Sequence, residues 1–177
     1  MMLRNHLAER KDTLLARWFR LIIESYPPDL SNFLSLEKDR FANPVGYTIS
    51  HGIAAIFDGL IHEADSDRVI EALDSIIRIR AVQEFTPSQA LSFVFLLKKA
   101  VREELNVRNV ERTAPDKIRL LEELGQLETK IDGLASLAFD VYVKCRDDIN
   151  RIRVDKANAD RAMTMRLARM TRSRGEE

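Results

Sequence analysis

The sequence predicts an all-helical protein, because apolar residues recur at helical spacing along most of the chain and the five prolines fall at the ends of these stripes. Glycine is scarce, with 6 in 177 residues. Hydrophobic residues make up 45% and charged residues 32%, a balance typical of a globular domain rather than of a disordered or membrane-embedded chain. We therefore expect a single helical bundle, globin-like or related, with a long C-terminal helix.

The first predicted helix carries one wide apolar stripe and ends before Tyr26-Pro27-Pro28, since proline disfavours helical geometry in the residue before it. Its stripe comprises Leu7, Leu14, Leu15, Trp18, Phe19, Ile22 and Ile23. A short helix is expected over residues 29–37. Asn43-Pro44 then reads as an N-cap followed by a first-turn proline, and the helix that it opens should run to about His62.

Two further helices begin with the same kind of signal. The Asp-Ser-Asp sequence at residues 65–67 precedes a stripe that contains Ile76 and Ile77. Thr86-Pro87 precedes an apolar segment at residues 90–105. We expect the second of these helices to be the most deeply buried one.

The longest stripe runs from Leu120 to Ile152 in steps of three and four residues, after a polar connection at residues 106–113. Glycine costs about 1 kcal/mol relative to alanine inside a helix, so Gly125 and Gly133 are candidate positions for a bend. Residues 161–174 contain five arginines and no acidic residue, which is typical of a frayed helix or a basic tail. We assign residues 1–152 to a helical domain and residues 153–177 to a basic extension.

Charge and cysteine content exclude several classes of protein. Lys and Arg total 28, as do Asp and Glu, so the net charge does not favour a nucleic-acid partner. Cys145 is the only cysteine, which excludes an internal disulfide and fits a reducing compartment. The first ten residues carry charges where a signal peptide is apolar, and the apolar run at residues 93–97 is far shorter than the roughly 20 residues of a membrane span. We expect a cytoplasmic protein.

Catalytic and metal-binding patterns are not evident in the sequence. The histidines are His6, His51 and His62, and none has a glutamate three residues before it, as a carboxylate-bridged metal pair would require. Haem needs only one axial histidine, so His51 or His62 keeps haem open as an alternative. There is no Gly-x-Ser-x-Gly elbow and no glycine-rich phosphate loop. We predict no enzyme, no metal site and no cofactor.

The most informative stretch is residues 76–90, where polar and charged side chains alternate with expected core residues. The stripe through Ile76 and Ile77 places Arg80 at least partly inward, and a buried guanidinium needs a carbonyl, a carboxylate or a ligand. In the simpler interpretation Arg80 and Gln83 tie two helices together; in the functional one they line a polar pocket or hinge. The candidate pocket or hinge residues are Arg78, Arg80, Gln83 and Gln89. The residues expected to set the structure of the junctions are Asn43, Pro44, Phe85, Thr86, Pro87 and Ser88.

Four segments resemble the N-terminal domain of RsbRD-type RsbT co-antagonist proteins: WFRLIIESYPP (18–28), RFANPVG (40–46), IRIRAVQEFTPSQA (77–90) and FVFLLKKAVREEL (93–105). The most distinctive part is Arg-Ala-Val-Gln-x-Phe-x-Pro-Ser-Gln at residues 80–89. The resemblance covers roughly residues 10–145 and implies a helical sensory module, related in role to the non-haem globin-like input domains of stressosome proteins. Those modules pair as dimers and pass a signal to a C-terminal STAS output domain.

The residues after 145 are too few and too poor in strand formers for a STAS domain, so we expect a stand-alone input module with a separate protein partner. The expected function is a non-catalytic sensory or regulatory module that acts through protein–protein interaction in a stress-type or metabolic signalling pathway. We expect a homodimer, with the stripe from Leu120 to Ile152 as a candidate interface. The alternatives are a haem- or small-ligand-binding bundle, and an adaptor subunit that docks through its basic C-terminus.

Overall fold

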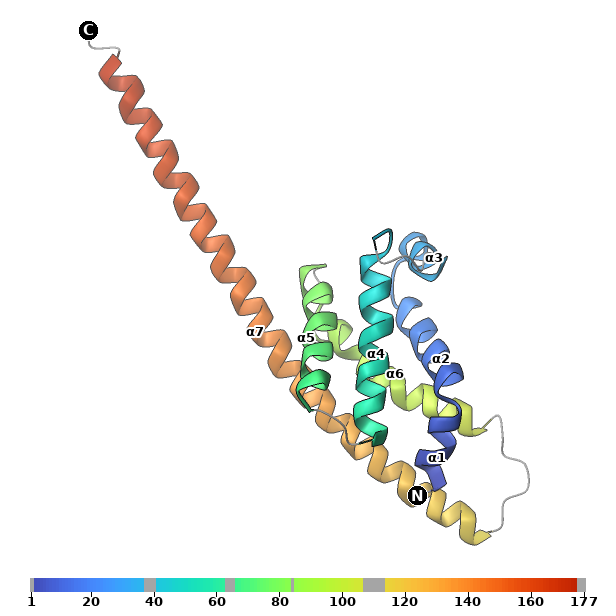
Figure 1. The fold of residues 1–177 in the computed structure, drawn as a ribbon. Helices are drawn as coiled ribbons and strands as arrows, with labels where there is room; N and C mark the ends of the chain where they lie inside the picture. Colours follow the sequence, from blue (N-terminus) through green and yellow to red (C-terminus); the bar gives the residue numbers. More distant parts are fainter. Residues whose placement is uncertain (1, 37–40, 63–65, 84, 107–113, 175–177) are drawn as a thin grey trace. The chain divides into compact units, whose positions relative to one another are not determined.

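The computed structural model describes residues 2–36, 41–62, 66–83, 85–106 and 114–174. Within these ranges the chain forms seven α-helices and no strand, which confirms the predicted all-helical class (Figure 1). The helices are α1 (Met2–Glu9), α2 (Lys11–Ile23), α3 (Pro28–Leu36), α4 (Pro44–His62), α5 (Ser66–Val82), α6 (Pro87–Asn106) and α7 (Ala114–Arg174). The chain divides into a first unit, Met1–Tyr142, and a second unit, Val143–Glu177, with the boundary inside α7.

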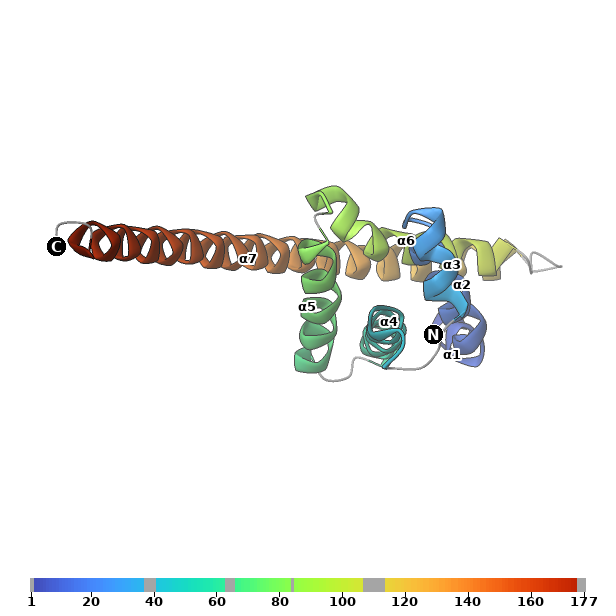
Figure 2. The same cartoon turned by 90° about the horizontal axis from the view of Figure 1, so that it is seen from above.

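In the first unit, α4 lies between α5 on one side and α1 and α2 on the other (Figures 1 and 2). Helix α6 packs mainly on α2 and also contacts α5. The core contains large side chains that are almost fully buried, including Trp18, Phe57, Phe93 and Ile131. The Trp18 indole Nε1 donates a hydrogen bond of 2.7 Å to the carbonyl of Phe93 and so ties α2 to α6.

Helices α4 and α5 approach each other closely at Gly52. A Cβ atom at this position would lie 2.7 Å from the Cδ1 atom of Ile76 on α5. Two helices can come this close only where one of them has no side chain at the contact. Gly52 therefore fixes the point at which α5 rests on α4.

The first apolar stripe forms two helices and not the single helix that we expected. The break is at Arg10, with φ −111° and ψ 15°, and no proline or glycine marks it in the sequence. Leu3 and Leu7 on α1 are buried, as is Leu14 on α2. Both short helices therefore bury apolar side chains on either side of Arg10.

Helix α7 runs without interruption through both Gly125 and Gly133, so neither glycine ends the helix. A side chain at either glycine would meet no atom within 4 Å. Residues 161–174 are helical. The predicted cap residue Asp65 and most of the polar connection, residues 107–113, lie outside the described residues.

The long stripe of α7 is partly a core stripe of the first unit. Leu127, Ile131, Ala135, Ala138 and Tyr142 are all buried. Since the domain covers these side chains itself, this part of the stripe is not free to bind a second copy. A dimer interface on α7 has to use other side chains.

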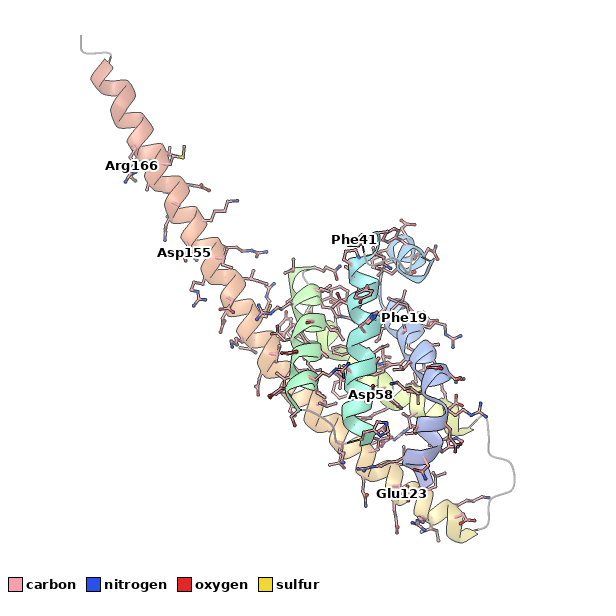
Figure 3. The ribbon with its side chains drawn as sticks, in the orientation of Figure 1. Phe19, Phe41, Asp58, Glu123, Asp155 and Arg166 are labelled. Carbon is pink, nitrogen blue, oxygen red and sulfur yellow. The ribbon has the colours of Figure 1, made fainter. Side chains whose placement is uncertain are left out.

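In the second unit, the side chains of residues 150–166 are exposed, and Figure 3 shows Asp155 and Arg166 projecting from the helix. The exposed side chains include four large apolar ones, Ile152, Val154, Met163 and Met165. None of the helices described combines the length and the hydropathy that a membrane span requires.

Candidate functional site at the junction of α5 and α6

The end of α5, the start of α6 and the end of α2 meet around Arg80. Arg80 lies in the last turn of α5, one helical turn beyond the core residues Ile76 and Ile77. This register carries it to the inner face of the helix, where its exposed fraction is 0%. A full guanidinium group is therefore enclosed by the first unit.

Three residues surround the guanidinium of Arg80. Its Nη2 donates to the hydroxyl oxygen of Ser25 at 3.0 Å, and that hydroxyl donates to the carbonyl of Ile22 at 2.6 Å. Its Cζ lies 4.6 Å from the ring centroid of Phe85 and 5.2 Å from that of Tyr26. The two rings meet edge to face, with centroids 5.1 Å apart. Desolvated cation–π contacts of this kind contribute about 2 kcal/mol.

Three polar atoms at this site have no hydrogen-bond partner in the described part of the chain. Among the described residues, Arg80 Nε, Arg80 Nη1 and the Tyr26 hydroxyl are buried without a hydrogen-bond partner. Burial lowers the pKa of Arg80, with an opposing effect from Tyr26, and burial likewise raises the pKa of Tyr26. Arginine nevertheless stays protonated at neutral pH. The site therefore holds a buried cation whose hydrogen-bonding capacity is only partly used.

A cavity of about 420 Å³ lies directly beside this cation. Its lining comprises Ser25, Tyr26, Pro27, Leu30, Gln83, Phe85 and Gln89. Ser25, Tyr26 and Phe85 are also the residues that contact the guanidinium. The cavity walls thus combine aromatic and aliphatic surface with a few polar groups, the composition expected of a small-molecule site.

Two of the predicted pocket residues, Gln83 and Gln89, line this cavity with exposed side chains. Gln89 also has a structural role, because its Oε1 accepts bonds of 3.0 Å from the backbone N–H and the hydroxyl of Thr86. The backbone N–H of Gln89 in turn donates to the Thr86 hydroxyl, which forms a capping box at the start of α6. Pro87 is the first residue of α6, and the Ser88 hydroxyl lies 3.2 Å from that of Thr86.

The other predicted residues lie outside the Arg80 site. Arg78 is exposed and pairs with Asp74 one turn earlier on α5. Asn43 is buried at the start of α4: its Oδ1 accepts a bond of 2.8 Å from the Gly46 N–H, and its Nδ2 donates to the Leu34 carbonyl at 3.1 Å. Pro44 is the first residue of α4. Asn43 and Pro44 thus set a different junction, between α3 and α4.

Sequence reasoning missed three residues of this site. Tyr26 was interpreted only as the end of the first predicted helix, and neither Ser25 nor Tyr142 was singled out. Tyr142 donates from its hydroxyl to the Phe85 carbonyl at 2.9 Å, which bonds the junction to α7. Ser25 is 55 residues from Arg80, and Tyr142 is 57 residues from Phe85, so no local pattern could have indicated either contact.

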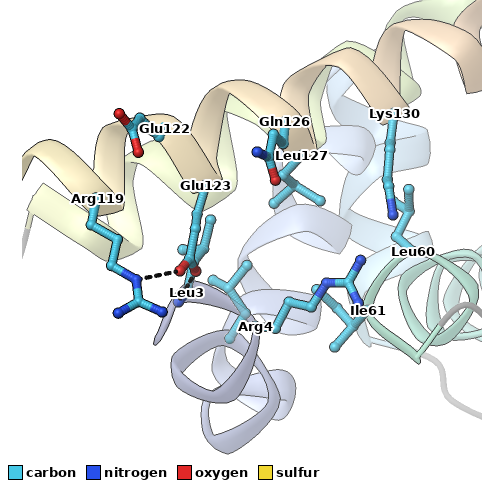
Figure 4. A pocket seen from close by; sticks show the side chains of 11 residues that line it. Leu3, Arg4, Leu60, Ile61, Arg119, Glu122, Glu123, Gln126, Leu127 and Lys130 are labelled. Carbon is cyan, nitrogen blue, oxygen red and sulfur yellow. Dashed lines mark hydrogen bonds and ion pairs between the residues drawn. The ribbon is translucent and has the colours of Figure 1, made fainter. Parts of the chain in front are cut away.

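Another cavity, of about 440 Å³, lies between α1, α4 and α7 (Figure 4). Two of its charged groups pair with each other, since Glu123 accepts from the Leu3 N–H at 2.7 Å and pairs with Arg119 at 3.3 Å. None of the described residues that line it has a buried polar side-chain atom without a hydrogen-bond partner.

A third cavity, of about 570 Å³, is lined mainly by apolar residues of α2 and α4 and includes His51. The His51 ring stacks on Tyr47, and its Nδ1 lies 2.9 Å from the Tyr47 carbonyl. Within the described residues, no group of three or more His, Cys, Asp or Glu side chains is placed to hold a metal ion.

Comparison with known families gives one match. The family model for the RsbT co-antagonist protein rsbRD N-terminal domain matches residues 12–155. Neither the curated proteins nor the solved structures give a significant match. Membership of this family implies a role in stressosome-type regulatory signalling. The match confirms the resemblance drawn from the sequence: the chain belongs to the RsbRD N-terminal domain family, a regulatory, sensory-type family rather than a known catalytic one.

Proposed function

We propose that this protein is a non-catalytic regulatory module of the cytoplasm, which forms a homodimer and binds separate stressosome-type proteins. The family match supports the regulatory class. The dimer and the binding of partner proteins are proposed from the structure of α7. This helix contributes core residues such as Ile131 to the first unit, is bonded to the α5–α6 junction through Tyr142, and exposes its side chains from residue 150 to 166.

The exposed part of α7 is suited to pairing with a second helix. A helix with little tertiary packing depends on partner contacts for most of its stability. Ile152, Ala159 and Met163 follow one another at seven and four residues, so they lie on one face. Ile152 and Met163 are 65% and 64% exposed. We call this face, formed by Ile152, Ala159 and Met163, the seam and propose it as the primary dimer interface.

A second apolar surface lies on the pair formed by α6 and α7 in the first unit. Ion pairs of 2.6 Å join Lys98 to Asp132 and Arg102 to Glu128, which sets the two helices antiparallel. Phe95 on α6 and Phe139 on α7 are both 48% exposed. This surface is the second candidate for the dimer contact.

Light scattering tests the dimer with a matched pair of variants. Ile152→Asp combined with Met163→Asp places two charges in the seam and should yield a monomer at micromolar concentration. Val154→Asp combined with Met165→Asp has the same spacing and the same charge change on another face, and should remain a dimer. A monomeric wild-type protein, or equal behaviour of the two double variants, would contradict the proposal.

Binding of a separate partner is tested with purified proteins. We expect the chain to co-migrate with RsbT, or with a STAS-domain stressosome protein of the same organism, in size-exclusion chromatography. Absence of a complex with either protein at micromolar concentration would contradict this part of the proposal.

A further inference from the structure

The α5–α6 junction combines three features that a purely structural role does not require. Arg80 is fully buried, two of its three nitrogen atoms have no hydrogen-bond partner among the described residues, and a cavity of about 420 Å³ adjoins the residues that enclose it. Leaving donors of a buried charge without hydrogen-bond partners is costly, and a carboxylate or another anion is the usual compensation. We propose that this cavity binds a small organic carboxylate and that Arg80 is the group that recognises it.

The guanidinium has two adjacent N–H donors that a carboxylate can bind at the same time. Nη2 carries two N–H groups, and the hydroxyl of Ser25 accepts only one bond from it. Each unpaired nitrogen, Nε or Nη1, is a potential second donor beside Nη2. A planar carboxylate matches such a fork with two parallel charge-assisted bonds, whereas a neutral amide would leave the charge unpaired. The buried Tyr26 hydroxyl is a further unused donor next to the same cation.

The residues that line the cavity indicate the size and polarity of the ligand beyond its carboxylate group. Tyr26, Pro27, Leu30 and Phe85 supply apolar surface, and the volume falls in the range of small-molecule sites. A tetrahedral phosphate would need donors on three sides, which these walls do not supply. The best match is a carboxylate with a small apolar or aromatic body.

The carboxylate reaches Arg80 only when a covering ring moves, since Arg80 itself is fully buried. Phe85 is the residue to move, because its side chain is half-buried and it follows the end of α5. Its backbone N–H bonds to the Arg80 carbonyl at 3.2 Å, and its carbonyl accepts the hydroxyl of Tyr142 at 2.9 Å. Ligand binding is thereby linked to α7 through a single hydrogen bond. This second step rests on the proposed role of α7, whereas the binding step stands alone.

Benzoate and its neutral counterpart benzamide test the recognition step. Isothermal titration calorimetry at neutral pH should show benzoate binding to the full chain, and benzamide binding at least about tenfold more weakly, because loss of one charged pairing costs well over 1.4 kcal/mol. The Nε–H resonance of Arg80 should shift on addition of benzoate. Equal binding of the two probes, tighter binding of inorganic phosphate, or no binding of benzoate at millimolar concentration would overturn the proposal.

Variants then separate recognition from folding. Arg80→Met should lose benzoate binding, and Arg80→Lys should weaken it at least about tenfold while the charge is kept, since lysine lacks the planar fork. Arg78→Met is the matched control on the exposed side of the same helix and should bind as the wild type does. Circular dichroism establishes that each variant is folded. Unchanged benzoate binding by a folded Arg80→Met or Arg80→Lys variant would remove Arg80 from the site.

Tyr142→Phe tests the link to α7. Hydrogen exchange of the α7 amides near residue 142 should change when benzoate binds the wild type and should not change in Tyr142→Phe, although benzoate still binds. An identical exchange response in both proteins would overturn the link. Neither measurement requires a dimer, so failure of the proposed homodimer and failure of this inference can be told apart.

Discussion

The junction between α3 and α4 and the junction between α5 and α6 each bury one large polar side chain, and they treat it in opposite ways. Asn43, 1% exposed, uses its amide oxygen for the Gly46 N–H and its amide nitrogen for the Leu34 carbonyl. Arg80, 0% exposed, bonds through one nitrogen and has two others without partners in the described structure.

This difference distinguishes a buried polar residue with a structural role from one whose donors remain available to a ligand. A buried group whose bonds are all made holds a particular backbone arrangement, and its removal leaves its partners unsatisfied. A buried cation with unused donors contributes little net stability, because its desolvation is only partly compensated. The comparison therefore predicts that the smaller residue, Asn43, matters more for folding than the larger one.

The largest effect should follow Asn43→Ala, which removes a helix cap and leaves the Leu34 carbonyl without this donor. We expect a loss of about 2–3 kcal/mol in the free energy of unfolding, measured by urea denaturation. Asn43→Ser keeps a side-chain oxygen that can cap the helix and loses the bond to Leu34, so its loss should be smaller. A loss under about 0.5 kcal/mol for Asn43→Ala would contradict the structural role.

A smaller effect of opposite sign is expected for Tyr26→Phe, which removes a buried hydroxyl without a partner. The variant should gain about 1 kcal/mol in urea denaturation. Tyr142→Phe deletes the same atom where it donates to the Phe85 carbonyl, and should lose about 1 kcal/mol. Equal signs for the two variants would show that pairing of the hydroxyl does not decide the outcome.

The alkaline pH profile offers a second check on Tyr26. Its pKa is raised in the folded protein, so the unfolded chain releases this proton first. Wild-type stability should therefore fall as the pH rises above the ordinary tyrosine pKa of about 10, and Tyr26→Phe should reduce this fall. Urea denaturation below and above that pH measures the difference.

The smallest net effect is expected for Arg80→Met. The variant loses the bond to Ser25 and the contacts of the charge with two aromatic rings, but it no longer buries unpaired donors, and methionine fills much of the same space. We expect stability within about 1 kcal/mol of the wild type. A loss greater than that of Asn43→Ala would reverse the comparison.

The sequence was informative wherever the cause is local. Proline positions mark the starts of α3, α4 and α6, and the spacing from Ile76 and Ile77 indicates that Arg80 lies on the inner face of α5. The break at Arg10 has no such marker, because the residues around it are compatible with a continuous helix.

The environment of Arg80 could not be predicted for a different reason. Ser25 and Tyr26 lie in the turn after α2 and Tyr142 lies on α7, both far in sequence from the end of α5, and their meeting depends on how whole helices pack. The same holds for the α7 stripe, since spacing shows that a helix face is apolar but not which surface covers it. Burial of Ile131 within its own unit is a property of the tertiary fold.

The contact between Gly52 and Ile76 constrains how the α5–α6 junction can respond to a ligand. Ile76 lies one turn before Arg80, and its side chain is pressed against the bare backbone of α4. Sliding of α5 along α4 would have to lift Ile76 out of this seat, whereas a small tilt about it would not. We expect α5 to tilt about its contact with Gly52. Such a tilt would move Arg80, near the C-terminal end of α5, and Phe85, which follows that helix.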